Sequence, residues 1–269
     1  MDINEFESRF NLLKPHIRKA GEKIIQMREA PDFQVTKKTD DSPVTNADFW
    51  SNEYFTKLLQ KSFPGEIVIG EESEDKEYPE GAEVIWYLDP IDGTKNYVKG
   101  SDHFYILIGL SIDGMPALGI MYKPMIGQFV VGYEDSVYSI DKSDNRTTLR
   151  ADQTFPSGAT LIMKRVNQEL REALKKEFGI ERHRYIRDMI DMLGPLYGES
   201  NGYITMRRTA FWDLCTPAAI MKATGYEIAH NHNHSPILFN DGDYETDYFY
   251  SLPPSIPEGV KKLLFQYLE

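Results

Sequence analysis

Two aspartates stand three residues apart in the stretch WYLDPIDGTKNYVKG, which covers residues 86 to 100. The preceding VIWYL is nearly all apolar, which is typical of a strand buried on both faces. Asp89 and Asp92 would project from its carboxyl end, where nearby carboxylates repel each other and raise each other's pKa. A divalent cation removes that repulsion, and Mg²⁺ prefers oxygen ligands such as these carboxylates and the carbonyl of Ile91. On this stretch alone, an ordinary corner between a strand and a turn explains the residues equally well.

The residues that follow indicate a place for an anion. Gly93 and Thr94 would carry free backbone N–H groups if a helical turn starts there, and such groups bind phosphate. Pro90 has no backbone donor, so we expect the ladder of strand hydrogen bonds to stop at this residue.

Three further carboxylates are candidates for the same site. Glu71 and Glu72 follow the apolar stretch IVIG, and the acidic run continues through residues 74–77, so taken alone they indicate a solvated turn. Sequential strands are usually neighbours, which would bring Glu71 to the same sheet edge as Asp89. Asp213 precedes an expected helix, where it is either a helix cap or a carboxylate that the second half of the chain delivers to the metals.

Asp48 has a structural explanation. Thr45 and Asp48 fit a capping box at the start of a helix. Its other role would be to orient, together with Thr94, the water that attacks a phosphorus atom. From the residues alone we favour the cap, because it requires no catalysis.

A histidine-rich stretch, HNHNH, is the remaining candidate. His230, His232 and His234 would share one face of an extended chain, as a zinc or nickel site requires. No carboxylate or cysteine pattern completes such a site, so a solvated loop is the favoured interpretation. Cys215 lies in no Cys/His motif and is expected to pack inside a helix.

Apolar spacing predicts the elements that position these residues. Steps of three and four predict a long helix over residues 6–27, in which Pro15 should cause a kink or a split. A second helix is expected over residues 46–62. The pattern then changes to strands of a largely antiparallel sheet, in the stretches EIVIG, VIWYLD, FYILIGLSI, PALGIMYKP, QFVVGY and SVYSI.

A polar, turn-rich segment over residues 141–158 separates two expected domains. The N-terminal domain covers residues 1–145 and carries most of the candidate ligands, and the C-terminal domain covers residues 150–269. Strand and helix alternate in the second domain, through ATLIM, NQELREALKKEF, GYITM, TPAAIMKATG and IPEGVKKLLFQYLE.

The composition narrows the classes of partner. The chain has 269 residues and a formal net charge of -12, which disfavours nucleic-acid polymers and anionic membranes. A single cysteine allows no internal disulfide, so we expect a reducing cytoplasm. The acidic N-terminus is unlike a signal peptide, and the longest apolar run is far shorter than a membrane span.

Four motifs in order resemble the inositol monophosphatase superfamily of metal-dependent, lithium-sensitive phosphatases. They are KTDDSPVTNAD, IGEES, LDPIDGTKN and FWDLCTPAAIMKATG, and they span roughly residues 38 to 225. The resemblance implies a layered α-β-α-β-α sandwich of the α+β or α/β class, with the site between its two halves. Its partner would be a small phosphorylated metabolite, and many members are homodimers.

The resemblance also implies the metal ligands. By motif position, the first Mg²⁺ would be held by Glu71, Asp89 and the carbonyl of Ile91. The second would be held by Asp89, Asp92 and Asp213. Two metal ions roughly 3.5–4 Å apart can activate a water and neutralise the attacking and leaving oxygens, so attack would be in line without a phosphoenzyme.

The remaining implied roles lie next to these ligands. Gly93 and Thr94 would contact the phosphate through backbone N–H groups. Thr94 and Asp48 would position the nucleophilic water, a role that can coexist with the helix cap. Glu72 is a candidate ligand for a third metal ion.

The motif details favour one branch of the superfamily. KTDDSPVTNAD, DGTKNY and WDLCTPAA resemble the 3'(2'),5'-bisphosphate nucleotidases, which convert 3'-phosphoadenosine 5'-phosphate to AMP. Met206 stands where inositol monophosphatases carry a glutamate that meets the inositol hydroxyls. Arg165, Arg207 and Arg208 could hold a second phosphate, although each alone is more simply a surface charge.

Some features depart from that branch. MKRVNQEL and YIRDMIDMLGPLYGES replace its serine- and histidine-bearing segment and its glycine-serine step, and Gly225-Tyr226 replaces a glycine pair. An inositol monophosphatase and a histidinol-phosphate or sugar phosphatase therefore remain as alternatives. A catalytically silent protein that binds metal and phosphate is the alternative outside the enzyme class.

Overall fold

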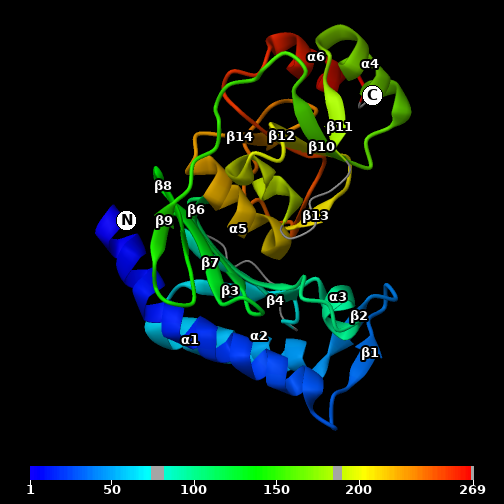
Figure 1. Ribbon diagram of the computed structural model, residues 1–269. Helices are drawn as coiled ribbons and strands as arrows, with labels where there is room; N and C mark the ends of the chain where they lie inside the picture. Colours follow the sequence, from blue (N-terminus) through cyan, green and yellow to red (C-terminus); the bar gives the residue numbers. More distant parts are fainter. Residues whose placement is uncertain (74–81, 184–189, 268–269) are drawn as a thin grey trace.

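The computed structural model describes residues 1–73, 82–183 and 190–267, and its elements stack in five layers (Figure 1). The layers are, in order, two helices, a seven-stranded sheet, a central helical layer, a five-stranded sheet and two further helices. The α-β-α-β-α sandwich predicted from the sequence is therefore confirmed. The helices, in layer order, are α1 (Ile3–Glu29) and α2 (Asn46–Ser62), then α5 (Phe211–Lys222) with the 3-10 helix η1 (Asp191–Tyr197), then α4 (Gln168–Phe178) and α6 (Glu258–Gln266).

The larger sheet has the strand order β3-β4-β5-β6-β7-β8-β9. Strands β3 and β4 are parallel, and every later pair is antiparallel, as predicted for this half. The strand β9 lies in the polar segment that was expected to be rich in turns. No strand was predicted there, because its three exposed polar residues carry no apolar alternation. The strands are β3 (Ile67–Gly70), β4 (Val84–Asp92), β5 (Tyr105–Ile112), β6 (Met115–Lys123), β7 (Gln128–Tyr133), β8 (Ser136–Ile140) and β9 (Arg146–Thr148).

The smaller sheet has the order β11-β10-β12-β16-β14. Strands β11, β10 and β12 are parallel, while β16 runs antiparallel to both of its neighbours. Its strands are β10 (Thr160–Lys164), β11 (Glu181–His183), β12 (Gly202–Thr205), β14 (Glu227–His230) and β16 (Phe249–Leu252). Two short ribbons and one short helix complete the fold: β1 (Val35–Lys37) with β2 (Pro43–Thr45), β13 (Thr209–Ala210) with β15 (Glu245–Thr246), and α3 (Thr94–Val98).

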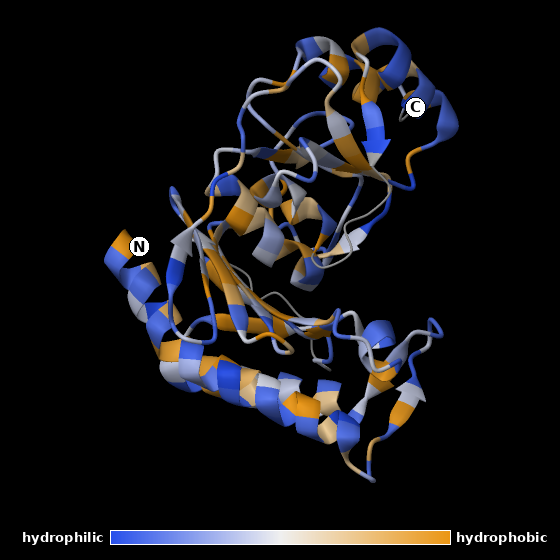
Figure 2. Cartoon of the chain, in the orientation of Figure 1, coloured by the Kyte–Doolittle hydropathy of each residue, from blue (hydrophilic) through white to orange (hydrophobic). Residues whose placement is uncertain are grey.

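Three apolar cores hold the layers together. The first lies between α1, α2 and the larger sheet, the second surrounds α5 between the two sheets, and the third joins the smaller sheet to α4 and α6. Figure 2 shows hydrophobic residues concentrated on the strands of the larger sheet and hydrophilic ones along the outer side of α1. Each sheet is thus covered on both faces, which explains the nearly continuous apolar sequence of strands such as β4.

Pro15 does not split the first helix. The helix α1 continues through it from Ile3 to Glu29, so the predicted split is wrong. Pro15 cannot donate to the carbonyl of Asn11, but both residues are exposed. Water can therefore satisfy that carbonyl, and the apolar face of the helix stays on the sheet.

Other predictions have different outcomes. The helix over residues 46–62 and its capping box are confirmed. The acidic run at residues 74–77 and the start of YIRDMIDMLGPLYGES lie outside the described residues. The division into domains at residues 145 and 150 stays a prediction, although the chain does pass from the larger to the smaller sheet between Thr148 and Thr160. Across the described ranges, no helix has the length and apolarity needed to cross a bilayer.

A row of three glycines seats α5 on the larger sheet. Gly109, Gly119 and Gly132 lie opposite one another on β5, β6 and β7. A Cβ atom on Gly109 would come within 2.8 Å of Cys215, and one on Gly119 would collide with the carbonyl oxygen of Thr216. The helix therefore approaches the strands more closely than any side chain would allow. Cys215 packs inside this interface, as expected.

We expect Gly119→Ala to lower the free energy of unfolding by about 1–3 kcal/mol, because the added methyl group must push α5 away from the sheet. Urea denaturation followed by circular dichroism measures this change. The control is Thr147→Ala on the exposed strand β9, which should change stability by less than about 0.5 kcal/mol. Equal effects of the two substitutions would contradict the close approach.

Candidate metal centre

A bulge at the end of β4 directs two aspartates to one side. Asp89 pairs with Leu107 and Asp92 with Tyr105, so β4 has one residue more than β5 between these pairs. Residues three apart in a regular strand point to opposite faces, and the extra residue removes that alternation. The ladder therefore resumes after Pro90, and the prediction that it stops there is wrong. The bulge is stabilised by the Ile91 N–H, which donates to Asp89 Oδ1 at 3.0 Å.

The parallel pairing of β3 and β4 places Glu71 beside Asp89. Gly70 pairs with Leu88, and the next backbone N–H, that of Glu71, donates to the Leu88 carbonyl at 2.9 Å. Both strands therefore end at the same edge with a carboxylate, as the order of the motifs predicted.

Asp213 comes from the other half of the chain. It lies inside the first turn of α5, which begins at Phe211, and no side chain caps this helix. The prediction that Asp213 precedes the helix is therefore wrong, and the cap interpretation is unsupported. The apolar pair before it already belongs to the helix, because Phe211 is buried in the second core.

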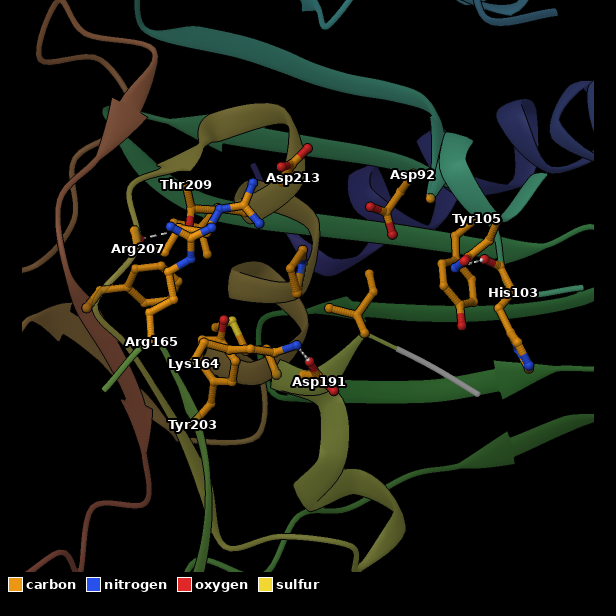
Figure 3. Close-up of a pocket in the computed structure, with 17 residues that line it drawn as sticks. Asp92, His103, Tyr105, Lys164, Arg165, Asp191, Tyr203, Arg207, Thr209 and Asp213 are labelled. Atoms are coloured by element: carbon orange, nitrogen blue, oxygen red, sulfur yellow. Dashed lines mark hydrogen bonds and ion pairs between the residues drawn. The ribbon is translucent and has the colours of Figure 1, made fainter. Parts of the chain in front are cut away.

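These three carboxylates converge. Glu71, Asp89 and Asp213 each offer an oxygen atom, and these atoms all lie within 4.8 Å of one another. Within the described ranges they form the only group of three or more such side chains. Asp92 lies next to them and lines the cavity with Asp213 (Figure 3).

Burial and mutual repulsion disfavour charge on this group. Burial, followed by the charge of Glu71, raises the pKa of Asp89 well above its ordinary value. Burial and then Glu71 raise the pKa of Asp92 to about 6. Burial and then the charge of Asp92 raise the pKa of Asp213 to about 8. Carboxylates that resist ionisation in this way require a nearby positive charge.

Lys38 supplies part of that charge. Its ammonium donates to Glu71 Oε1 at 2.6 Å and also pairs with Glu72. Burial alone would lower the pKa of Lys38, but the hydrogen bonds and charges of the two glutamates outweigh it and raise the pKa. The lysine therefore occupies one side of Glu71 and shows that this edge of the site attracts cations.

The residues fit hard divalent cations. Three carboxylate oxygens are already gathered and Asp92 adjoins them, while burial and neighbouring carboxylates raise the pKa of Asp89, Asp92 and Asp213 and so disfavour their charged forms. Carboxylate and carbonyl oxygens are the ligands that Mg²⁺ prefers.

Asp48 and Thr94 are joined by a hydrogen bond beside this centre. Asp48 Oδ2 accepts from the Thr45 N–H at 2.8 Å and from the Thr45 hydroxyl, which completes the capping box. Its other oxygen, Oδ1, accepts from Thr94 Oγ1 at 3.2 Å. The carboxylate of Asp48 thus caps the start of α2 with one oxygen and contacts Thr94, beside the candidate metal centre, with the other.

Gly93 directly precedes the short helix α3, next to the candidate metal ligands. Its φ of 87° is left-handed, and a Cβ atom there would lie 3.0 Å from the carbonyl oxygen of His103. Only glycine makes this turn without strain. The helical turn expected after Asp92 is therefore confirmed.

A cavity of about 860 Å³ opens from the centre between the two halves of the chain. Asp92, His103 and Tyr105 line one side, and a group from the second half lines the other (Figure 3). That group contains Lys164, Arg165, Asp191, Tyr203 and Arg207. This volume lies within the range of small-molecule sites.

The three predicted arginines differ in position. Arg165 and Arg207 line the cavity, and neither guanidinium has an ion-pair partner among the described residues. Arg165 has a φ of 52°, so the chain turns sharply after β10, and Lys164 and Arg165 both reach the cavity. Arg208 is not part of the lining. Its guanidinium is neutralised by Asp243 at 3.0 Å and by two further carboxylates.

Sequence reasoning missed several cavity residues. Lys164 forms an ion pair with Asp191, and Tyr203 and His103 line the same space. The only available signal was the position of Lys164 directly before Arg165. Nothing in the sequence pairs Lys164 with a carboxylate 27 residues later (191 minus 164) on η1.

Comparison with known proteins gives concordant matches. A model of the inositol monophosphatase family matches residues 7–248. An inositol-1-monophosphatase of Bacillus subtilis is 27% identical over 219 residues, which are 80% of this chain and 82% of that protein. The 3'(2'),5'-bisphosphate nucleotidase CysQ of Salmonella typhimurium is 27% identical over 213 residues, which are 78% of this chain and 86% of that protein.

The fold has solved counterparts as well. A crystal structure of an IMPase/NADP phosphatase, complexed with Mg²⁺ and phosphate, superposes with a TM-score of 0.74 at 17% identity. The superposition covers 96% of this chain and 95% of that chain. The two relatives are equally similar to this chain in sequence, and their names give different substrates. The matches therefore agree on the class of reaction but do not identify the substrate, which has to be inferred from the residues that line the cavity.

We expect the metal-free protein to lose stability between pH 6 and pH 8. The pKa of Asp213 rises from 3.8 to about 8 on folding, so in this window the folded state binds more protons than the unfolded chain. The free energy of unfolding then falls as pH rises, by up to about 1.4 kcal/mol per pH unit for one group.

Urea denaturation with a chelator at both pH values measures this loss, and added Mg²⁺ should reverse it. The control is Asp213→Asn, which should flatten the pH dependence. A metal-free protein that is more stable at pH 8 would contradict the placement of these carboxylates.

Proposed function

The chain belongs to the inositol monophosphatase family, and on that premise we propose that it uses two Mg²⁺ ions to hydrolyse a small phosphate monoester that carries a second phosphate, most readily a 3'(2'),5'-bisphosphate nucleotide. Members of this family are phosphatases, so the chain is a phosphomonoester hydrolase. The observation that carries the choice of substrate is that two guanidinium groups, those of Arg165 and Arg207, line the same cavity as the carboxylates of Asp92 and Asp213.

The proposed ligand sets share one residue. Glu71, Asp89 and the carbonyl of Ile91 would hold one ion, and Asp89, Asp92 and Asp213 would hold the other. The gathering of Glu71, Asp89 and Asp213 within 4.8 Å supports both sets. Glu72 is not one of the three carboxylates that converge, so we assign it no metal.

Bound Mg²⁺ supplies positive charge that neutralises the phosphate and makes a water more acidic. The chain supplies the remaining steps. The Thr94 hydroxyl lies 3.2 Å from Asp48 Oδ1 and 3.0 Å from the Ile91 carbonyl oxygen. With that carbonyl on the metal, the hydroxyl would donate its one proton to Asp48 and accept a hydrogen bond from the attacking water. Burial raises the pKa of Asp48, so its carboxylate takes up a proton more readily than an exposed aspartate does. The backbone N–H groups of Gly93 and Thr94 would orient the phosphate.

The cavity beyond the phosphate favours an anionic, partly planar substrate. Arg165 and Arg207 line it with guanidinium groups that have no ion-pair partner in the part of the chain that the structure describes, and such groups suit phosphate oxygens. Tyr105, Tyr203 and Phe249 add aromatic surface on which a nucleobase can pack. Arg208 is left out of the proposal, because three carboxylates neutralise it outside the cavity.

The position of Met206 supports a substrate other than inositol phosphate. Its side chain packs against the third apolar core, away from the cavity lining. The residue therefore offers no acceptor for a ring of hydroxyl groups.

We expect Asp89→Asn to reduce the rate of Mg²⁺-dependent phosphate release by roughly 10³-fold or more, because the shared ligand loses its charge. The folded state should remain, since the substitution also removes repulsion between buried carboxylates. Phosphate release from a generic monoester and thermal melting in chelator measure the two effects. The control is Asp135→Asn at an exposed turn. A variant at position 89 that keeps near wild-type turnover would refute the ligand assignment.

We expect 3'-phosphoadenosine 5'-phosphate to be hydrolysed far faster than AMP or inositol 1-phosphate. Arg165→Met should raise the KM for the bisphosphate by about tenfold or more, because a charged hydrogen bond contributes about 1.5–3 kcal/mol. The same variant should leave a simple aryl phosphate unaffected.

The matched control is Arg208→Met, which should leave both substrates unchanged. Equal rates on the three natural esters would defeat the second-phosphate site while leaving the phosphatase assignment intact.

A further inference from the structure

The histidine-rich stretch forms a tight turn at the edge of the smaller sheet. The His230 N–H donates to the Ser235 carbonyl at 2.9 Å, and the His234 N–H donates to the His230 carbonyl at 3.0 Å. The bridge between Ala229 and Pro236 closes the turn from outside. Hydrogen bonds thus hold the six residues from 230 to 235 in one compact loop, and His232 and Asn233 are exposed, which agrees with the solvated loop expected from the sequence.

The two asparagines hold this loop, and the three histidines do not. Asn231 is buried, and its Nδ2 donates to the Thr205 carbonyl at 3.0 Å. Asn233 Oδ1 accepts from the Ser235 N–H at 2.9 Å and from its hydroxyl at 2.7 Å. The asparagine side chains of HNHNH therefore hold the backbone of the loop, and the imidazole rings are not needed for this.

The imidazoles have unused donor atoms. No hydrogen bond or ion pair involves the rings of His230, His232 or His234 within the described ranges. The Nδ1 atoms of His230 and His234 are buried, and no described residue bonds to them, so a polar atom of each ring is left unsatisfied. A lone pair left in this way is the form in which a histidine binds a metal.

Two of the rings already lie together. The centroids of His230 and His232 are 5.3 Å apart, and His232 is exposed, so its ring can rotate without disturbing the loop. The ring of His234 leans on Tyr250, with centroids 5.8 Å apart, and belongs to the same turn. Burial, followed by the charge of His232, lowers the pKa of His230, which keeps that ring neutral.

We propose that this turn binds a transition-metal dication of the Zn²⁺, Ni²⁺ and Cu²⁺ class, with His230 and His232 as its principal ligands. Nitrogen donors suit these ions, whereas Mg²⁺ prefers oxygen ligands, so the chemistry separates this site from the carboxylate centre. Asp241 and Asp247 act electrostatically on His230 and add negative charge that favours a dication. The three histidines are absent from the cavity lining, so the site lies outside the cavity.

The test is isothermal titration with Zn²⁺ in the presence of saturating Mg²⁺, which keeps the carboxylate centre occupied. The wild-type protein should show one binding event that His232→Asn weakens at least about tenfold and that His230→Asn/His232→Asn abolishes. The matched control is His16→Asn, whose ring lies on α1 beside Tyr54, and it should bind Zn²⁺ like the wild type.

A second readout identifies the donor atoms. Cu²⁺ bound to the wild-type protein should show nitrogen couplings in its electron paramagnetic resonance spectrum, and the double variant should lose them. Phosphate release should be the same in His232→Asn and in the wild type, since the exposed ring is outside the cavity. Zn²⁺ affinity that is unchanged in His232→Asn and in the double variant would overturn the proposal, as would a wild-type protein that binds no Zn²⁺.

Discussion

Repulsion among buried carboxylates is the constraint on which the rest of this structure depends. Burial and then the charges of neighbouring carboxylates, Glu71 among them, raise the pKa of Asp89, Asp92 and Asp213, so the fold holds these side chains where their anionic forms are least stable. Such a cluster persists only because rigid elements on several sides over-determine it. The site is therefore strained without cations, and this strain gives it affinity for them.

Three independent devices position the cluster. The bulge in β4 turns Asp89 and Asp92 to one side, the parallel pairing of β3 and β4 sets Glu71 beside them, and the glycine row seats the helix that carries Asp213. The strand pairing and the glycine row act through backbone contacts, whereas the bulge also uses a candidate ligand, since Asp89 Oδ1 accepts from the Ile91 N–H. Most of the geometry is thus built by groups other than the ligand side chains.

The sequence predicted most of the larger sheet and the meeting of Glu71 with Asp89 at one of its edges, because apolar strands ending in acidic residues are local patterns. Features that depend on contacts between residues far apart in the sequence could not be predicted. The helix α5 begins with two apolar residues, Phe211 and Trp212, which pack in the second core. Their sequence carries no signal for a helix start, so the start of α5 before Asp213 could not be predicted. The exposed strand β9 has no apolar alternation, and the pairing of Lys164 with Asp191 depends on how η1 meets the smaller sheet. Arg208 shows the same limit, since its three acidic neighbours come from a later ribbon and loop.

The capping box at Thr45 and Asp48 has a consequence for how this protein can change over time. One carboxylate begins α2 through Oδ2 and meets Thr94 through Oδ1, so the helix needs the residue whether or not catalysis does. A descendant that abandoned phosphate chemistry would still be selected to keep Asp48, whereas Asp213, which caps nothing, would be free to drift. In such a lineage the presence of Asp48 would be poor evidence of activity, and the loss of Asp213 would be the earlier mark of a silent protein.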